Sequence, residues 1–173
     1  IVDPLQKGDK YPFKRLATVG IVYKLAQEIL EEKLSKELER NFLELTGLAT
    51  IADMMPREQD NQEFIEWGLL SLRTTLRPGL RVFFEMDFAD NASIQEIAQK
   101  IISVTNISES TPDNLNQTYL ILTSSDNRKA KELIEKLLEQ GRQKRIRIKE
   151  ITEEVEERIS KSREEVIVFE GDT

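Results

Sequence analysis

The stretch that decides the fold is the longest one without a break, residues 127–162, NRKAKELIEKLLEQGRQKRIRIKEITEEVEERISKS. It has no proline and one glycine, Gly141, and its pattern is helical throughout. At about 1.5 Å per residue such a helix would be about 50 Å long. Its apolar positions are sparse, so we predict a bridging helix, packed at its ends and partly bare between them. These positions are Leu133, Leu137, Ile146, Ile148, Ile151, Val155 and Ile159.

Charge is segregated along this predicted helix. A basic block comes first and an acidic block follows: Arg142, Lys144, Arg145, Arg147 and Lys149, then Glu150, Glu153, Glu154, Glu156 and Glu157. One interpretation is a solvated helix with ion pairs three or four residues apart, such as Lys149 with Glu153. The other is a basic stripe that contacts DNA phosphates. The block has no aromatic residue to stack on bases, which favours the first interpretation.

Upstream of this stretch the pattern is also mainly helical. Helices are predicted over about 16–34, 41–55 and 62–75, and Pro56 ends the second. In the first helix the apolar residues form one stripe, which predicts its packed face: Leu16, Val19, Val22, Leu25, Ala26, Ile29 and Leu30. In the third, we expect Phe64, Ile65, Leu69 and Leu72 to face inward. Trp67 is also expected in the core.

Turns and caps separate these segments. Residues 77–79 (RPG) predict a turn in which Gly79 takes a positive φ. Ser93 and Glu96 fit a capping box that starts a helix through Ile102. Residues 116–123 suit a strand or a helix equally. Residues 165–171 read as a strand running into a turn, and because a lone strand lacks backbone partners, we expect it to come from a larger sheet. The first residue is also not Met. From these two ends together, we expect a chain truncated on both sides.

Composition excludes several kinds of chemistry. Among 173 residues there is no cysteine and no histidine, which rules out a disulfide scaffold, a thiolate zinc site and a cysteine nucleophile within this sequence. Any metal ligand must be a carboxylate or a neutral oxygen. The formal net charge of −7 disfavours tight nucleic-acid binding by the chain alone. No apolar run approaches the roughly 20 residues of a membrane span, and a cytoplasmic location is expected.

Several motifs resemble, in order and spacing, those of RecJ-type single-stranded-DNA-specific exonucleases of the DHH phosphoesterase superfamily. Residues 11–26 are similar to the family's YPFK-x-LAGVG-x-x-x-KLA segment, and residues 48–56 (LATIADMMP) to its LGTIADVVP motif. Asn61 falls at the asparagine of its GENR loop, and residues 77–80 match its RPGL turn. Asn106 and Asp113 fall at the two ends of a segment that reads roughly NAAGRLGD in the family.

The resemblance implies an α/β parent protein of which this chain is an internal, mainly α fragment. Residues 1–90 would be the C-terminal part of the DHH phosphoesterase domain, and 91–126 a small helical segment leading to the connector. Residues 127–163 would be the long interdomain helix, and 164–173 the truncated start, with the first strand, of a DHHA1-type domain. The parallel sheet would lie mostly upstream.

The resemblance also implies a metal-dependent 5′–3′ exonuclease acting on single-stranded DNA in recombination and repair. Two Mn²⁺ or Mg²⁺ ions activate a water in such enzymes, and the family's IADVVP aspartate, here Asp53, is one of their ligands. Asp53 stands in an apolar run, where a buried carboxylate would need a cation or several donors to stay ionised. A helix-terminal cap is the structural alternative for Asp53. Asn61 and Asn106 are weaker substrate-binding candidates, and a turn residue is the alternative for Asn106.

The Asp-His-His motif that gives the superfamily its name is absent, because the sequence has no histidine. No complete catalytic site is therefore expected, and this chain alone is predicted to be inactive. Three positions also depart from the family: Ser110, Val104 and Gln62 stand where it usually has arginine, a residue hard to replace at a phosphate contact. The alternatives are therefore a catalytically lapsed scaffold or replication-associated binding protein, and a DHH phosphodiesterase acting on short oligonucleotides or cyclic dinucleotides.

Overall fold

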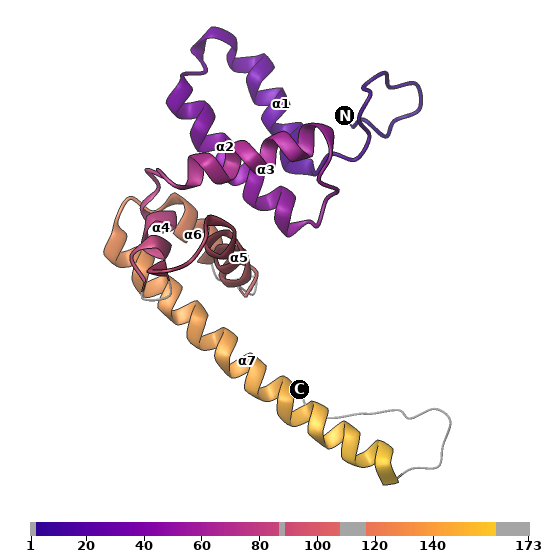
Figure 1. Cartoon of the computed structure of the whole chain (residues 1–173), viewed down its shortest axis with the longest axis vertical. Coiled ribbons are helices and arrows are strands. Elements are labelled where there is room, and N and C mark those ends of the chain that lie inside the picture. Colours follow the sequence, from indigo (N-terminus) through magenta and orange to yellow (C-terminus); the bar gives the residue numbers. More distant parts are fainter. Residues whose placement is uncertain (1–2, 87–88, 108–116, 162–173) are drawn as a thin grey trace.

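The computed structural model describes residues 3–86, 89–107 and 117–161, and this part of the chain is built from helices and loops (Figure 1). The expected strand at 165–171 lies outside the described residues, as does Asp113. The helices are α1 (Thr18–Leu30), α2 (Lys36–Ala52), α3 (Gln59–Leu72), α4 (Pro78–Arg81), α5 (Ile94–Thr105), α6 (Gln117–Thr123) and α7 (Asn127–Lys161). Short 3₁₀ turns follow α1, at Glu31–Lys33, and α4, at Val82–Phe84.

The first three helices form one unit, in which α2 and α3 pack most closely (Figure 1). Glycines allow this: a Cβ added to Gly68 would lie 2.6 Å from the Leu43 carbonyl oxygen and 2.8 Å from the Gly47 Cα. Helix α2 starts five residues before the predicted 41, because Ser35 caps it by accepting a hydrogen bond from the Leu38 N–H at 3.2 Å.

The predicted inner face of α1 is confirmed only in part. Val22 and Ile29 are 57% and 70% exposed, whereas Gly20 and Tyr23 are buried. Tyr23 packs edge-on against Phe64 of α3, with ring centroids 5.4 Å apart. An aromatic ring and a close glycine contact therefore set the buried face of α1. Val22, Leu25 and Ile29 are left exposed, and the rest of the aliphatic stripe is half-buried.

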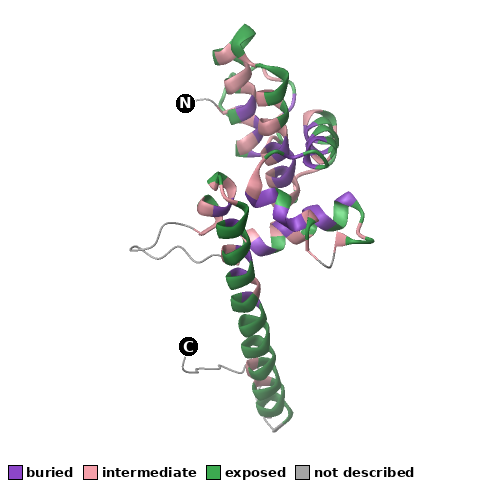
Figure 2. Cartoon of the chain, turned by 90° about the vertical axis from the view of Figure 1, so that its left-hand side faces the viewer, coloured by how far each residue is buried: buried purple, intermediate pink, exposed green. Residues whose placement is uncertain are grey.

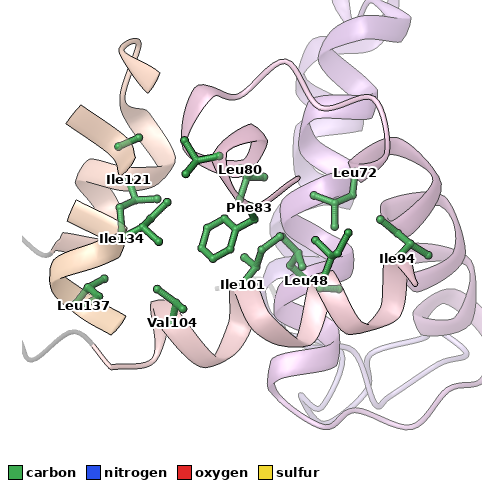
Figure 3. Packing of buried hydrophobic residues seen from close by; sticks show 14 residues of the cluster. Leu48, Leu72, Leu80, Phe83, Ile94, Ile101, Val104, Ile121, Ile134 and Leu137 are labelled. Carbon is green, nitrogen blue, oxygen red and sulfur yellow. The ribbon is translucent and has the colours of Figure 1, made fainter. Parts of the chain in front are cut away.

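The second part of the molecule holds the main apolar core. We call its buried residues the apolar cluster (Figure 3): Leu48, Leu72, Leu80, Val82, Phe83, Ile94, Ile97, Ala98, Ile101, Val104, Ile121, Ala130, Ile134 and Leu137. Leu48 of α2 and Leu72 of α3 link it to the first unit. Burial of aliphatic side chains from α4 to α7 is the main source of stability here.

The RPG segment forms the start of α4 rather than a turn with a positive φ. Pro78 takes the first helical position, where its missing N–H costs nothing. Gly79 is needed for space: a Cβ there would lie 1.9 Å from the Ile121 carbonyl oxygen of α6. The predicted turn with a positive φ at Gly79 was therefore wrong, and the glycine serves close packing against α6 instead.

Arg77 joins the two parts of the molecule. Its guanidinium donates to the Asn41 carbonyl of α2 at 3.2 Å and to the Leu122 carbonyl of α6 at 3.4 Å. It also lies 3.7 Å from the carboxylate of Glu44, a residue that is only 3% exposed. Burial raises the pKa of Glu44, while a hydrogen bond from Thr75 and the charges of Arg77 and Arg40 oppose that rise.

Other predictions of local structure can now be compared with the structure. The capping box of Ser93 and Glu96 is confirmed at the start of α5, and residues 117–123 form a helix. The long helix is confirmed as α7, but within the described residues only its first half is packed. Ile159, near its far end, is 51% exposed. In these parts of the chain no helix combines the length and apolar character that a membrane crossing requires.

Candidate functional site

Asp53 ends α2. Its backbone N–H donates to the Ala49 carbonyl at 2.9 Å, and its φ of −77° and ψ of 3° turn the chain out of the helix. Met54 then takes a left-handed φ of 51°. The N–H groups of Met54 and Met55 return to the carbonyls of Ile51 (3.0 Å) and Thr50 (3.2 Å). This is a Schellman motif, with methionine at the position that usually holds glycine.

The Asp53 side chain is exposed, which corrects the expectation of a buried carboxylate. Met54, its neighbour, is 90% exposed, so the apolar run is not packed around it. Among the described residues no hydrogen bond or ion pair engages the Asp53 carboxylate. Its position suits a cation, because the negative end of the α2 dipole adds to the carboxylate charge.

Asn61 is fully buried near the start of α3. Its Nδ2 donates to the Arg15 carbonyl at 2.7 Å and to the Pro56 carbonyl at 3.1 Å. Among the described residues its Oδ1 has no hydrogen-bond partner. Asn61 thus ties the segment before α1 to the loop after α2. The substrate contact expected of it stays a prediction, and the geometry gives it a positioning role.

A second link between the same segments centres on Asp60. The Tyr11 hydroxyl donates to Asp60 Oδ2 at 2.6 Å, and Lys24 Nζ lies 3.3 Å from Asp60 Oδ1. Lys24 also lies over the rings of Tyr11 and Phe64, at 5.3 and 5.5 Å from their centroids. Burial opposes the charge of Lys24, but Tyr11 and Asp60 outweigh it and raise the pKa of Lys24. The cation is therefore held in place and charged.

The structure thus gathers three of the motif segments at one end of the α1–α3 unit. We call this region, residues 11–14, 51–56 and 60–61, the motif end. Arg15 adds an ion pair with Glu58 across it. Lys24 was recognised only as part of the motif at residues 11–26, and Asp60 was missed, although the tyrosine and the lysine of that motif indicated that a carboxylate would be needed nearby.

Asn106 lies elsewhere. It follows the last turn of α5, its backbone N–H donates to the Ile102 carbonyl at 3.1 Å, and its side chain is exposed. Val104 lies near Leu137 of α7 in Figure 3, and Ile107 contacts Gly141, where an added Cβ would lie 2.5 Å from the Ile107 side chain. The residues on either side of Asn106 therefore pack on α7, and the turn alternative fits its backbone.

Of the three departures from arginine, two lie in described residues. Val104 is fully buried in the apolar cluster, so an arginine there would place a guanidinium among aliphatic side chains. The absence of an arginine at position 104 therefore says nothing about phosphate binding. Gln62 is exposed and donates to Glu66 at 2.9 Å, so this position could present a cation to solvent and does not. Ser110 lies outside the described residues.

Trp67 is not a core residue as predicted, since 56% of its surface is exposed. It borders an open groove of about 620 Å³ between α1, α2 and α3. Lys24, Lys36 and Arg40 line the same groove, but Glu39, Asp60 and Glu63 balance them. With equal numbers of each charge, the groove has no marked preference for a polyanion.

The metal-binding capacity of the described residues is small. They contain no group of three carboxylates or other ligating side chains that could hold an ion. Asp53 can supply carboxylate oxygens, the donors that Mg²⁺ and Mn²⁺ prefer. The donor set therefore fits one ligand of a metal site and not a complete site.

No protein-family model matches the chain. It is 30% identical over 165 residues to the single-stranded-DNA-specific exonuclease RecJ of Bacillus subtilis (strain 168), covering 92% of this chain and 20% of that protein. The resemblance to RecJ is confirmed. The RecJ of Dickeya dadantii (strain 3937) is 28% identical over 105 residues, 54% of this chain and 18% of its own length. The chain thus spans about a fifth of the length of these RecJ relatives.

Proposed function

We propose that this chain is part of a metal-dependent exonuclease that hydrolyses single-stranded DNA in the 5′–3′ direction, in DNA recombination and repair. The observation that carries the proposal is similarity to RecJ across 92% of the chain. The motif end supports it, because the segments that carry the resemblance most clearly lie together there although they are up to about 50 residues apart in sequence.

Asp53 is the residue proposed to hold metal. Its carboxylate is exposed at the negative end of α2 and is not engaged by any described neighbour, so its oxygens are free to coordinate a cation. Two Mn²⁺ or Mg²⁺ ions would supply an activated water and stabilise the attacking and leaving oxygens of the phosphodiester. The described residues bring no further group of ligands together, so we expect this chain alone to bind metal poorly and to hydrolyse nothing.

The rest of the motif end would position Asp53. The loop after Asp53 is held from two sides, by Asn61 on the Pro56 carbonyl and by the Arg15–Glu58 ion pair. Tyr11 and Lys24 fix Asp60 at the start of α3. This arrangement limits where the end of α2 can move, and preorganised ligands are what a metal site requires.

The test compares variants of the complete protein that carries this chain. Nucleotide release from single-stranded DNA with a 5′ end is measured with Mn²⁺ for the wild type, Asp53→Ala and Asp90→Ala. Asp90 is the matched control, an exposed carboxylate outside the motif end. We expect Asp53→Ala to lose about 100-fold or more of the rate, since loss of a ligand exceeds the usual 10–100-fold cost of losing a supporting residue. Asp90→Ala should stay close to wild type.

A catalytically lapsed scaffold or replication-associated binding protein is the second candidate. The observation in its favour is Gln62, which faces solvent where the resemblance expects arginine. A wild-type protein that is folded and loaded with Mn²⁺, yet releases no nucleotides, would establish this candidate. Equal rates for the wild type and Asp53→Ala would instead remove Asp53 from the metal site.

A further inference from the structure

A buried polar network lies where the two parts of the molecule meet. We call it the Arg77 joint, and it consists of Arg77, the side chains of Glu44 and Thr75, and the carbonyl groups of Asn41 and Leu122. The Thr75 hydroxyl donates to Glu44 Oε2 at 2.8 Å and accepts from the Arg77 backbone N–H at 3.2 Å. Glu44 and Thr75 are 3% and 4% exposed. Because buried polar groups depend on the partners that they have, such a network holds one geometry.

The guanidinium of Arg77 contacts two helices at once. It donates to the Asn41 carbonyl of α2 and to the Leu122 carbonyl of α6. Leu122 lies in the last turn of α6, where carbonyls lack helical partners and a positive charge is favourable. Apolar contacts of Leu48 and Leu72 also link the two parts, but apolar packing is not directional, whereas hydrogen bonds are. Arg77 is therefore suited to set the angle between α2 and α6.

The angle of α6 is passed on to α7 through a short link, residues 124–126. Ser124 Oγ accepts from the Asp126 N–H at 3.1 Å, and Asp126 Oδ1 accepts from the Arg128 N–H at 2.8 Å, which caps the start of α7. Figure 2 shows α7 extending as a long rod away from the other described helices. A tilt of about 10° at the start of this 35-residue helix would move its far end by about 9 Å. A small change at the joint would thus become a large displacement.

The other helix held by the joint carries the proposed metal ligand. Glu44 and Asn41 lie on α2, and Asp53 ends the same helix about 14 Å beyond Glu44. We propose that Arg77 is a positioning residue for the nuclease reaction, because it fixes α7, and the domain to which α7 is expected to lead, at one angle to the helix that ends at Asp53. This inference rests on the proposed function. A long DNA strand held by that domain would reach the metal at Asp53 only at the correct angle.

Two variants separate positioning from folding. Arg77→Met alone should lower the melting temperature, because it leaves the Glu44 carboxylate buried without its cation. The double variant Arg77→Met with Glu44→Gln removes both charges and should recover most of that loss. It still lacks the donor to the Asn41 and Leu122 carbonyls. Arg81→Met is the matched control, since Arg81 lies on the same helix as the joint, is exposed, and has no hydrogen bond or ion pair from its side chain among the described residues.

The first measurement compares two substrates of the complete protein with Mn²⁺. One is a long DNA single strand, and the other is bis(p-nitrophenyl) phosphate, a phosphodiester small enough to need the metal site alone. The double variant should lose about 100-fold in kcat on the long strand with little change in KM, as misplacement of a bound substrate by about 1 Å can cost. Its rate on the small phosphodiester, and both rates of Arg81→Met, should stay close to wild type. Equal losses on the two substrates would overturn the positioning role.

The second measurement does not depend on activity. Spin labels at Glu37→Cys on α2 and Lys144→Cys on α7, both exposed positions, report the distance between the helices by double electron–electron resonance. This chain has no cysteine of its own, and any cysteine elsewhere in the complete protein is replaced by serine. We expect one narrow distance distribution in wild type and Arg81→Met, and a broader or shifted one in the double variant. An inactive wild type would contradict the proposed function, whereas a narrow, unshifted distribution in the double variant would overturn the role of Arg77.

Discussion

The motif end and the apolar cluster are held together by different chemistry. At the motif end, side chains reach across to backbone carbonyls and carboxylates: Asn61 to Arg15 and Pro56, Tyr11 and Lys24 to Asp60. In the apolar cluster, buried aliphatic residues and Phe83 pack together from segments between α2 and α7. Polar contacts fix direction and distance, whereas apolar packing supplies most of the stability. We infer that the motif end positions groups and the apolar cluster stabilises the fold.

The largest effect is expected from the apolar cluster. Phe83→Ala should lower the free energy of unfolding by about 3–5 kcal/mol, because Phe83 is fully buried and its removal leaves a cavity. Trp67→Ala removes a larger ring that is half exposed, so it should cost less. Urea denaturation followed by circular dichroism measures both. If Trp67→Ala cost more than Phe83→Ala, the assignment of the core would be wrong.

The next largest loss of stability is expected at the contact between α4 and α6. Gly79→Ala should cost about 3 kcal/mol, because the added Cβ would meet the Ile121 carbonyl oxygen, a backbone atom that cannot move alone. Gly141→Ala should be far milder, since its Cβ meets only the end of the Ile107 side chain, and alanine favours a helix. Thermal unfolding of the two variants compares them, and equal losses would contradict the close α4–α6 approach.

A smaller loss is expected at the motif end. Asn61→Ala should cost about 1–3 kcal/mol, because two carbonyls lose a donor that is fully buried. Asn106→Ala removes an exposed amide and should change the free energy of unfolding by less than about 0.5 kcal/mol. Hydrogen exchange would also locate the effect of Asn61→Ala, in residues 11–15 and 55–58. Faster exchange spread evenly over the apolar cluster would break the distinction between the two regions.

At the end of α2 a gain in stability is expected. Met54→Gly should raise the free energy of unfolding by up to about 1 kcal/mol, because glycine takes the left-handed φ of 51° without strain. The exposed methionine side chain has little packing to lose. A loss of stability in urea denaturation would mean that Met54 packs against something in this chain.

The smallest effect concerns Glu44, which lies between the two regions. Its pKa is raised in the folded chain, so the folded state holds this proton more tightly than the unfolded state. Its contribution is therefore favourable below the unfolded pKa and is lost as pH rises through the folded pKa. Glu44→Gln should flatten that part of the stability–pH curve. The effect is small because Thr75, Arg77 and Arg40 oppose the shift, and an unchanged curve would contradict it.

Sequence alone was sufficient where the signal is local. The long run without proline predicted α7, and Ser93 with Glu96 predicted the start of α5. It was not sufficient where the outcome depends on a distant contact. Apolar periodicity placed Val22 and Ile29 on the packed face of α1, and both are exposed, because Tyr23 sets that face by burying its ring on Phe64 of a helix about 40 residues away. Gly79 was recognised as special, but its reason is the backbone of α6.

The candidate site shows the same limit. The RecJ resemblance was confirmed, and the roles that motif order and spacing predict for Asp53 and Asn61 stay predictions. Whether each of these two residues is buried or exposed was not predictable from its neighbours in sequence. Asp53 stands in an apolar run and is exposed, because the Schellman turn points the chain outward. Asn61 stands in the polar stretch 57–63 and is fully buried, because two carbonyls from distant segments converge on it.

The proposal that Asp53 holds metal is tested most directly by locating the bound metal ions in the complete protein. Crystals soaked in Mn²⁺ give anomalous difference density at each bound ion. We predict a peak within coordination distance of an Asp53 carboxylate oxygen, and loss of that peak in Asp53→Ala with Asn61 and the loop 55–58 unmoved. Mn²⁺ bound elsewhere, with Asp53 facing water alone, would contradict it.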